Sequence, residues 1–160
     1  MSEQTLSESA RKVQAALSVL GLPCQVVELP ASTRTAPEAA QAVGCQVGQI
    51  VKSLIFRTQT SRRAILVLVS GSNRVDERKL AAIIGEPILK AEADFVREQT
   101  GFAIGGVPPV GHIRPLPAFV DEDLLQYEEV WAAAGTPNAV FKIDPRELPR
   151  ITGGELIKVR

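Results

Sequence analysis

Two features of this sequence could do chemistry on an anionic or carbonyl-bearing ligand: Lys52 and the stretch from 105 to 112. That stretch reads Gly-Gly-Val-Pro-Pro-Val-Gly-His and therefore holds three glycines and two prolines. Proline fixes φ, and glycine leaves its N–H group without a covering side chain, so a stiff loop of this kind can surround a small ligand closely. The alternative is an ordinary structural turn between two strands.

Lys52 lies inside an apolar run, with Val51 and Leu54 as close neighbours. A lysine in such a place is either an edge residue with its ammonium in water, or a point charge that a rigid strand presents to a phosphate or carboxylate. His112, the single histidine, closes the glycine–proline stretch. Its alternatives are a surface loop histidine and a residue of the site.

Several classes of site are excluded by what the sequence lacks. It has no GxSxG motif, no phosphate-binding Walker sequence and no GxGxxG between a strand and a helix. Cys24 and Cys45 are the two cysteines and have no CxxC spacing, so we expect reduced, structural thiols, no metal site and no cofactor. An enzyme with this inventory works by positioning and main-chain hydrogen bonds rather than through a covalent intermediate.

Composition indicates one globular domain over residues 1–160. Eighteen basic residues balance eighteen acidic ones, which argues against a protein that coats DNA or RNA by charge alone. No apolar run approaches the roughly 20 residues that span a membrane. The first residues lack a secretory signal pattern, so we expect a cytoplasmic protein without a membrane partner.

Periodicity and capping residues predict helices and strands that are interspersed without strict alternation. This favours an α+β fold with a mixed, mostly antiparallel sheet over a doubly wound one. A capping box at Thr5 and Glu8 predicts the start of the first helix, and Thr35, Asp76 and Asp144 are predicted caps of later helices. The predicted strands are 25–29, 50–56, 64–69, 88–89, 118–120, 130–134, 139–143 and 157–159, with 64–69 central and buried on both faces.

Three motifs in this order resemble the YbaK and prolyl-tRNA synthetase-associated editing domain family, the trans-acting aminoacyl-tRNA deacylases. They are Lys52 within the run 49–54, a GxxxPxG pattern at Gly105, Pro109 and Gly111, and the turn Gly135-Thr136-Pro137-Asn138. The resemblance spans nearly the whole chain. It implies a YbaK-like sheet of about six or seven strands surrounded by helices.

The resemblance also implies a pocket that hydrolyses the ester between a wrong amino acid and tRNA. Lys52, Gly111 and His112 would be its catalytic residues. The residues that would bind substrate are Gly105, Gly106, Pro109, Gly135, Thr136 and Asn138. Lys52 would hold the phosphate of the terminal adenosine, and main-chain N–H groups around Gly106 and Gly111 would receive the developing oxyanion.

The expected substrate is tRNA(Pro) that carries alanine or a similar small residue. The expected partner is the acceptor end of tRNA, and whether prolyl-tRNA synthetase is a further partner stays open. His112 stands in place of a glutamine-type residue of the cysteine-clearing branch, which favours a small aliphatic substrate. Two alternatives stay open: a Cys-tRNA(Pro) deacylase, and a non-catalytic module that binds aminoacyl-tRNA or a synthetase. Whether His112 acts as sieve or base also stays open.

Overall fold

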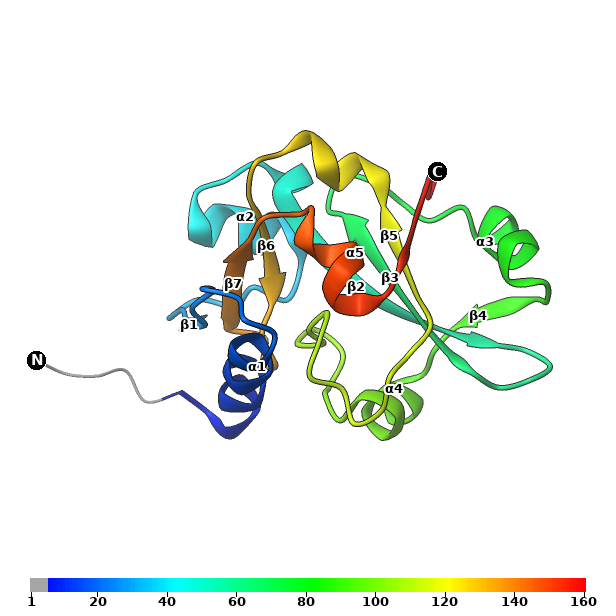
Figure 1. Cartoon of the computed structure of the whole chain (residues 1–160), viewed down its shortest axis with the longest axis horizontal. Coiled ribbons are helices and arrows are strands. Elements are labelled where there is room, and N and C mark those ends of the chain that lie inside the picture. The colour runs from blue at the N-terminus through cyan, green and yellow to red at the C-terminus, as the bar shows by residue number, and fades with distance from the viewer. Residues whose placement is uncertain (1–5) are drawn as a thin grey trace, which may run out of the picture.

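The structure is a computed structural model that describes residues 6–160. Its helices are α1 (Glu8–Val19), α2 (Ala36–Val43), α3 (Glu77–Ile84), α4 (Ala93–Thr100) and α5 (Glu147–Thr152), with short 3-10 turns η1 (Val47–Gln49) and η2 (Glu122–Gln126). Its strands are β1 (Val27–Glu28), β2 (Ile50–Thr58), β3 (Ala64–Ser70), β4 (Ile88–Lys90), β5 (Ala118–Asp121), β6 (Val130–Ala133), β7 (Ala139–Ile143) and β8 (Glu155–Ile157). Figure 1 shows these elements in chain order.

Within residues 6–160 the strands form one mixed sheet of eight strands, rather than six or seven. Their order is β1-β7-β6-β2-β3-β5-β8, and β4 pairs with β2 beside this path. The pairs β1–β7, β6–β7, β2–β3 and β2–β4 are antiparallel, whereas β2–β6, β3–β5 and β5–β8 are parallel. The mixed, mostly antiparallel α+β fold predicted from the sequence is therefore confirmed.

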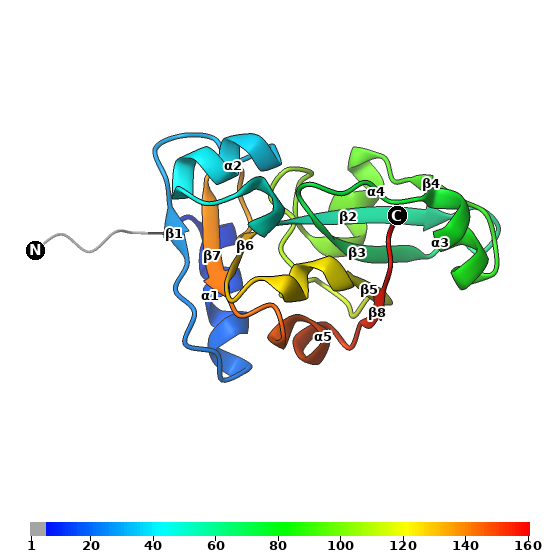
Figure 2. The ribbon, with the colours of Figure 1, turned by 90° about the horizontal axis from the view of Figure 1, so that it is seen from above.

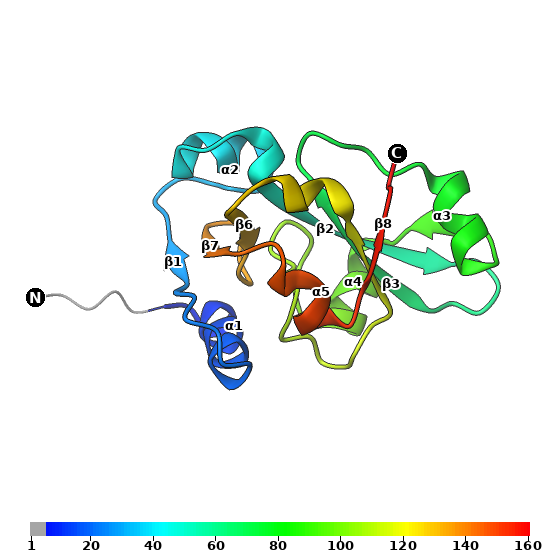
Figure 3. The same cartoon turned by 45° about the horizontal axis from the view of Figure 1, so that its top comes forward.

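Strand β3 lies in the interior of the sheet, between β2 and β5, and all seven of its residues are buried. On one face, α1, α4 and α5 pack against alternate side chains that include Val51 and Ile55 of β2. On the other face, α3 covers the set that includes Phe56 of β2, while α2 packs on Ile50. Figures 2 and 3 show α2 with β1, β6 and β7 at one end of the molecule and α3 at the other, and Figure 2 shows β4 beside α3.

Three local predictions need correction. Thr5 lies outside the described residues, and the cap of α1 is Ser7, whose side chain accepts from Ala10 N–H. Asp144 forms a turn, in which its side chain accepts from Arg146 N–H, and α5 begins only at Glu147. The last strand is Glu155–Ile157 instead of 157–159, because the carbonyl of Val159 accepts from Asp76 N–H beside α3.

The other predicted caps are present. Thr35 forms a full capping box with Glu38 at the start of α2, and the Asp76 side chain accepts from Lys79 N–H at the start of α3. The described part of the chain contains no helix that is long and apolar enough to cross a membrane.

Candidate functional site

Lys52 lies in the interior of the sheet rather than at its edge. It sits near the start of β2, which pairs with β3 on one side and with β6 and β4 on the other. Its side chain is half-buried, and Nζ donates a 2.6 Å hydrogen bond to the main-chain oxygen of Asn73. Burial, and then the nearby Arg74, lower the pKa of this ammonium below its ordinary value, against an opposing effect of Asp121. The ammonium is therefore held at one point and only partly hydrated.

A buried polar group fixes the segment that holds Lys52. Asp121, which is only 1% exposed, directly follows the hydrophobic part of β5, and its Oδ2 accepts from Ser70 N–H at 3.0 Å and from Asn73 Nδ2 at 2.9 Å. Asn73 Nδ2 also donates to Asp123. These bonds set the course of the chain after β3 and so place the Asn73 carbonyl that anchors Lys52. Sequence reasoning missed Asn73 and Asp121, although polar residues directly after buried strands were the available signal.

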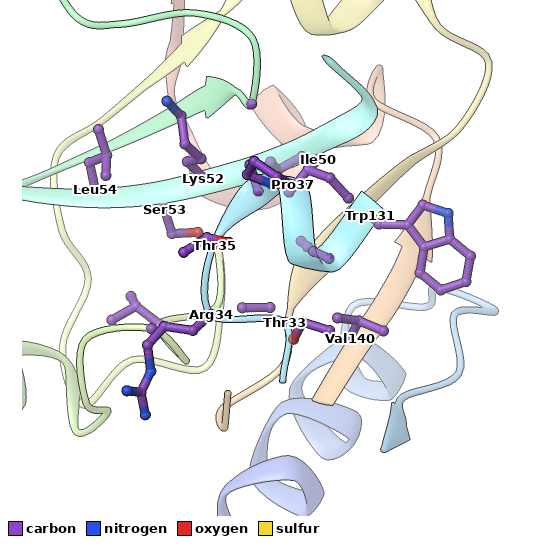
Figure 4. Close-up of a pocket in the computed structure, with 18 of the residues that line it drawn as sticks. Thr33, Arg34, Thr35, Pro37, Ile50, Lys52, Ser53, Leu54, Trp131 and Val140 are labelled. Atoms are coloured by element: carbon purple, nitrogen blue, oxygen red, sulfur yellow. The ribbon is translucent and has the colours of Figure 1, made fainter. Parts of the chain in front are cut away.

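Lys52 lines a cavity of about 500 Å³ between β2, the chain before α2, and the end of β6 (Figure 4). A neighbouring cavity of about 520 Å³ shares seven lining residues with it. The two cavities therefore form one continuous cleft along β2. The shared residues are Lys52, Ser53, Leu54, Arg74, Ile104, Gly105 and Val107. The apolar walls of the first cavity include the small side chains of Ala36, Ala132, Ala133 and Val140, beside larger ones such as Ile50 and Trp131.

The cleft is rich in positive charge, although the whole chain is neutral. Arg34, Lys52, Arg74 and Lys90 line it, against one acidic residue, Glu77. None of the ion pairs found within residues 6–160 involves these four cations. Because cations that lack acidic partners attract anions, the cleft suits a phosphate-bearing ligand. Arg34, Arg74 and Lys90 were not singled out from the sequence, because spacing along the chain does not bring them together.

The glycine–proline loop divides between two cavities. Gly105 lines the cleft of Lys52, and a Cβ on it would meet the Arg34 side chain at 3.1 Å. Gly106 is buried against the turn at 135–138, and its N–H donates to Ala103 O. This N–H is therefore already hydrogen-bonded within the loop, which argues against the predicted role of Gly106 as an oxyanion donor.

Pro109, Gly111 and His112 lie elsewhere. They line a cavity of about 480 Å³ with Ala16 and Val19 of α1, and Lys52 is not part of its wall. Nε2 of His112 lies 2.6 Å from Pro108 O, and its ring makes an edge contact with Phe102 at a centroid distance of 6.3 Å. Burial lowers the pKa of the imidazole, and the Pro108 carbonyl partly opposes this. The structure thus does not bring His112 or Gly111 to Lys52.

The turn at 135–138 is hydrogen-bonded to the segment that leads into α2 and lines the cleft. The Pro137 carbonyl accepts from both Thr33 N–H at 2.6 Å and Thr33 Oγ1 at 2.7 Å, and Thr33 lines the cleft. Thr136 Oγ1 accepts from Asn138 N–H, and the Asn138 amide donates to Leu29 O. Gly135, Thr136 and Asn138 are absent from the cleft wall in the described part of the chain. The turn therefore positions the segment that leads into α2.

Cys24 and Cys45 are both free and half-buried. Burial raises the pKa of each thiol, and Glu147 adds to the effect at Cys24. Among residues 6–160, no group of three histidine, cysteine or acidic side chains gathers as metal ligands would.

Comparisons with known proteins show similarity both in sequence and in fold. A family model described as "Aminoacyl-tRNA editing domain" matches residues 30–151. The uncharacterized protein YwhH of Bacillus subtilis (strain 168) is 32% identical over 123 residues, which cover 77% of this chain and 78% of that protein. EbsC of Enterococcus faecalis, named as a candidate Cys-tRNA(Pro)/Cys-tRNA(Cys) deacylase, is 23% identical over 128 residues, covering 78% and 76%.

A solved structure described as a candidate trans-editing enzyme for prolyl-tRNA synthetase is similar over the full fold. It is 58% identical and has a TM-score of 0.92, with 98% of this chain and 99% of that chain covered.

Proposed function

The chain belongs to the aminoacyl-tRNA editing domain family, and we propose that it is a trans-editing deacylase that removes a small, wrongly attached amino acid from tRNA(Pro) in the cytoplasm. The observation that carries the proposal is the half-buried ammonium of Lys52 inside a cationic cleft with small apolar walls. The charge suits the phosphate of the terminal adenosine, and the walls suit a short side chain.

Lys52 binds and orients the substrate rather than taking part in a covalent step. Its ammonium, held by the Asn73 carbonyl, has two further N–H donors for the phosphate oxygens. Arg34 and Arg74 supply further charge at the same cleft. An aminoacyl ester is already activated, so fixing it beside a water molecule and the free ribose hydroxyl supplies much of the rate.

The side-chain pocket selects by size. The apolar walls of the cleft beside Ser53, among them Ala132 and Val107, suit a short substrate side chain such as that of alanine, serine or cysteine. A pocket of apolar walls separates neighbouring small residues by only about tenfold to two hundredfold. Cysteine is a second candidate substrate, because EbsC is named for that activity.

The test is deacylation of purified tRNA(Pro) charged with alanine, serine, threonine, cysteine or proline. We expect turnover of at least one small residue and retention of proline. Binding of these tRNAs without hydrolysis of any would contradict the proposal and favour a non-catalytic module that binds aminoacyl-tRNA or prolyl-tRNA synthetase.

A further inference from the structure

Strand β2 has a short stretch without a strand partner along one of its two edges. We call the edge toward β3 the inner edge and the edge toward β6 and β4 the outer edge. On its inner edge β2 pairs with β3 continuously from Val51 to Arg57. On its outer edge it pairs with β6 only at Ile50 and Val51, and with β4 only from Phe56 to Thr58. The Ala91 N–H extends the β4 contact by donating to Ile55 O at 3.1 Å. Within residues 6–160, no strand pairs with the outer edge at positions 52–54.

The opening is one ladder position wide. Main-chain N–H and C=O groups of alternate strand residues point to opposite edges. The Ile55 carbonyl accepts from Ala91 N–H beside β4 and so uses the outer edge, whereas the Ile50 carbonyl accepts from Gly71 N–H on the β3 side. Ser53 lies two residues from Ile55 and three from Ile50, so its own N–H and C=O point to the outer edge. Lys52 and Leu54 direct theirs to β3.

The side chain of Ser53 is also unsatisfied. Its Oγ is the one buried side-chain nitrogen or oxygen atom without a hydrogen-bond partner in the described part of the chain. Buried hydroxyls are normally paired, so an unpaired one marks a place where a ligand or water belongs. Ser53 lines both cavities of the cleft together with Gly105 and Val107 of the glycine–proline loop. Figure 4 shows its side chain on the face of β2 opposite to Lys52 and Leu54.

We infer that this open position of β2 binds the α-amino acyl group of the substrate, an inference that rests on the proposed function. An aminoacyl ester has the same N–Cα–C=O unit as a strand residue. It can therefore exchange two hydrogen bonds with one strand residue, as in a hydrogen-bonded antiparallel pair. The Ser53 carbonyl accepts from the α-ammonium, and the Ser53 N–H donates to the ester carbonyl oxygen.

The same pairing places the substrate side chain. Paired residues direct their side chains to one face of a sheet, so the substrate side chain lies beside that of Ser53. On this face Val51, Ala132 and Val107 line the cleft with apolar side chains, which offer a substrate side chain no hydrogen bond. A serine substrate pairs its hydroxyl with Ser53 Oγ, whereas an alanine substrate leaves that oxygen unpaired. Binding at the outer edge of β2 therefore favours a serine substrate over an alanine substrate.

The experiment uses adenosine carrying an amino acid through a stable amide on its ribose, which cannot be hydrolysed. The alanyl, seryl and propionyl forms are titrated into the full chain, labelled with ¹⁵N, and followed by amide chemical shift and hydrogen exchange. We expect the Ser53 amide to move and become protected. Removal of the α-ammonium in the propionyl form should weaken binding by about tenfold or more, and the seryl form should bind about fivefold tighter than the alanyl form.

Two variants make the result specific. In Ser53→Ala the preference for the seryl form should vanish, while the main-chain amide still responds to the alanyl form. Ser18→Ala, at an exposed position of α1, is the control. An unmoved Ser53 amide, equal binding of the propionyl form, or no binding of any form would overturn the inference. Deacylation by the wild type with none of these effects rejects only this inference. Binding at Ser53 without deacylation of any charged tRNA rejects the proposed function instead.

Discussion

The main-chain oxygen of Gly106 accepts a hydrogen bond from the N–H of Gly135 at 2.8 Å. This bond joins the glycine–proline loop to the turn that supports Thr33, two segments almost thirty residues apart. The approach is so close that a Cβ on Gly106 would lie 2.8 Å from both Cα and N of Thr136. Such a contact leaves no space for any side chain at position 106.

Gly106→Ala should therefore destabilise the fold by about 1–3 kcal/mol, as overpacking against main chain does. Because Gly105 lines the cleft, the displaced loop should also lower the deacylation rate by about tenfold or more. Melting temperature and single-turnover deacylation check this. Gly85→Ala is the matched control: its φ is 96° and a Cβ there meets nothing within 4 Å, so only about 1 kcal/mol of strain is expected. Equal effects of the two changes would contradict the close approach.

Lys52→Ala should reduce kcat/KM for mischarged tRNA by about ten- to a hundredfold, because a charge-assisted contact to phosphate is lost. The melting temperature should change little, since the side chain is only half-buried and its hydrogen bond within the described residues goes to a main-chain carbonyl. Lys158→Ala, at an exposed position, is the control for loss of one positive charge. Normal turnover in a folded Lys52→Ala protein would remove Lys52 from the mechanism.

Asp121→Asn should destabilise the protein by about 1–3 kcal/mol and lower the rate as well. Both carboxylate oxygens accept hydrogen bonds: Oδ2 from Ser70 and Asn73, and Oδ1 from Asp123 N–H. Whichever way an amide is turned, its NH₂ group faces a donor. The Asn73 carbonyl then shifts and Lys52 with it. Chemical denaturation measures the loss of stability, and the deacylation assay measures the loss of rate. Asp144→Asn, at an exposed position, is the control. An unchanged deacylation rate in Asp121→Asn would show that Asp121 does not help to position Lys52.

His112 should make the stability depend on pH. Its pKa is lowered from an ordinary value of 6.5, so the unfolded chain binds a proton more readily than the folded one. Its contribution to the free energy of unfolding is full above pH 6.5 and is lost as the pH falls through 6.5 toward the lowered folded value. Urea denaturation from pH 5 to 8 should show this slope, and His112→Gln should flatten it.

The same variant tests whether His112 takes part in the reaction. It lines the cavity beside α1 and not the cleft of Lys52, so we expect deacylation by His112→Gln to keep its rate, its pH profile and its substrate range. A uniform loss of rate together with a lost inflection would instead support a general base. A changed substrate range at constant rate would support a sieve.

Cys24 and Cys45 should be dispensable for the reaction. Their raised pKa values keep both thiols protonated at neutral pH, and a protonated thiol is a poor nucleophile. The double change to serine should leave most of the deacylation rate intact. Alkylation by iodoacetamide should be slower than for a free cysteine of ordinary pKa. Complete loss of turnover in a folded double variant would indicate a cysteine mechanism.

Local sequence determined most of the secondary structure. Thr35 and Asp76 mark helix starts because their side chains satisfy main-chain donors of the next turn. The unbroken apolar run 64–69 indicated the central strand because only burial on both faces tolerates it. Lys52 stood out for the opposite reason, as a charge within an apolar strand. The three motifs in their order were enough to indicate the family. Each motif consists of residues that are close together in the sequence, so it can be recognised without the tertiary structure.

Tertiary structure alone decided how the candidate residues are grouped. The stretch 105–112 looks like one motif in the sequence, but Gly105 lines the cleft of Lys52 while Gly111 and His112 line the cavity beside α1. Between them, Gly106 is held against the turn at 135–138. The carboxylate of Asp121 reaches Asn73 through a parallel pairing of β5 with β3 that no local pattern specifies. The opening at Ser53 exists because β6 and β4 both stop short of it. Strand register is set by long-range packing, so a gap in a sheet leaves no trace in the residues that border it.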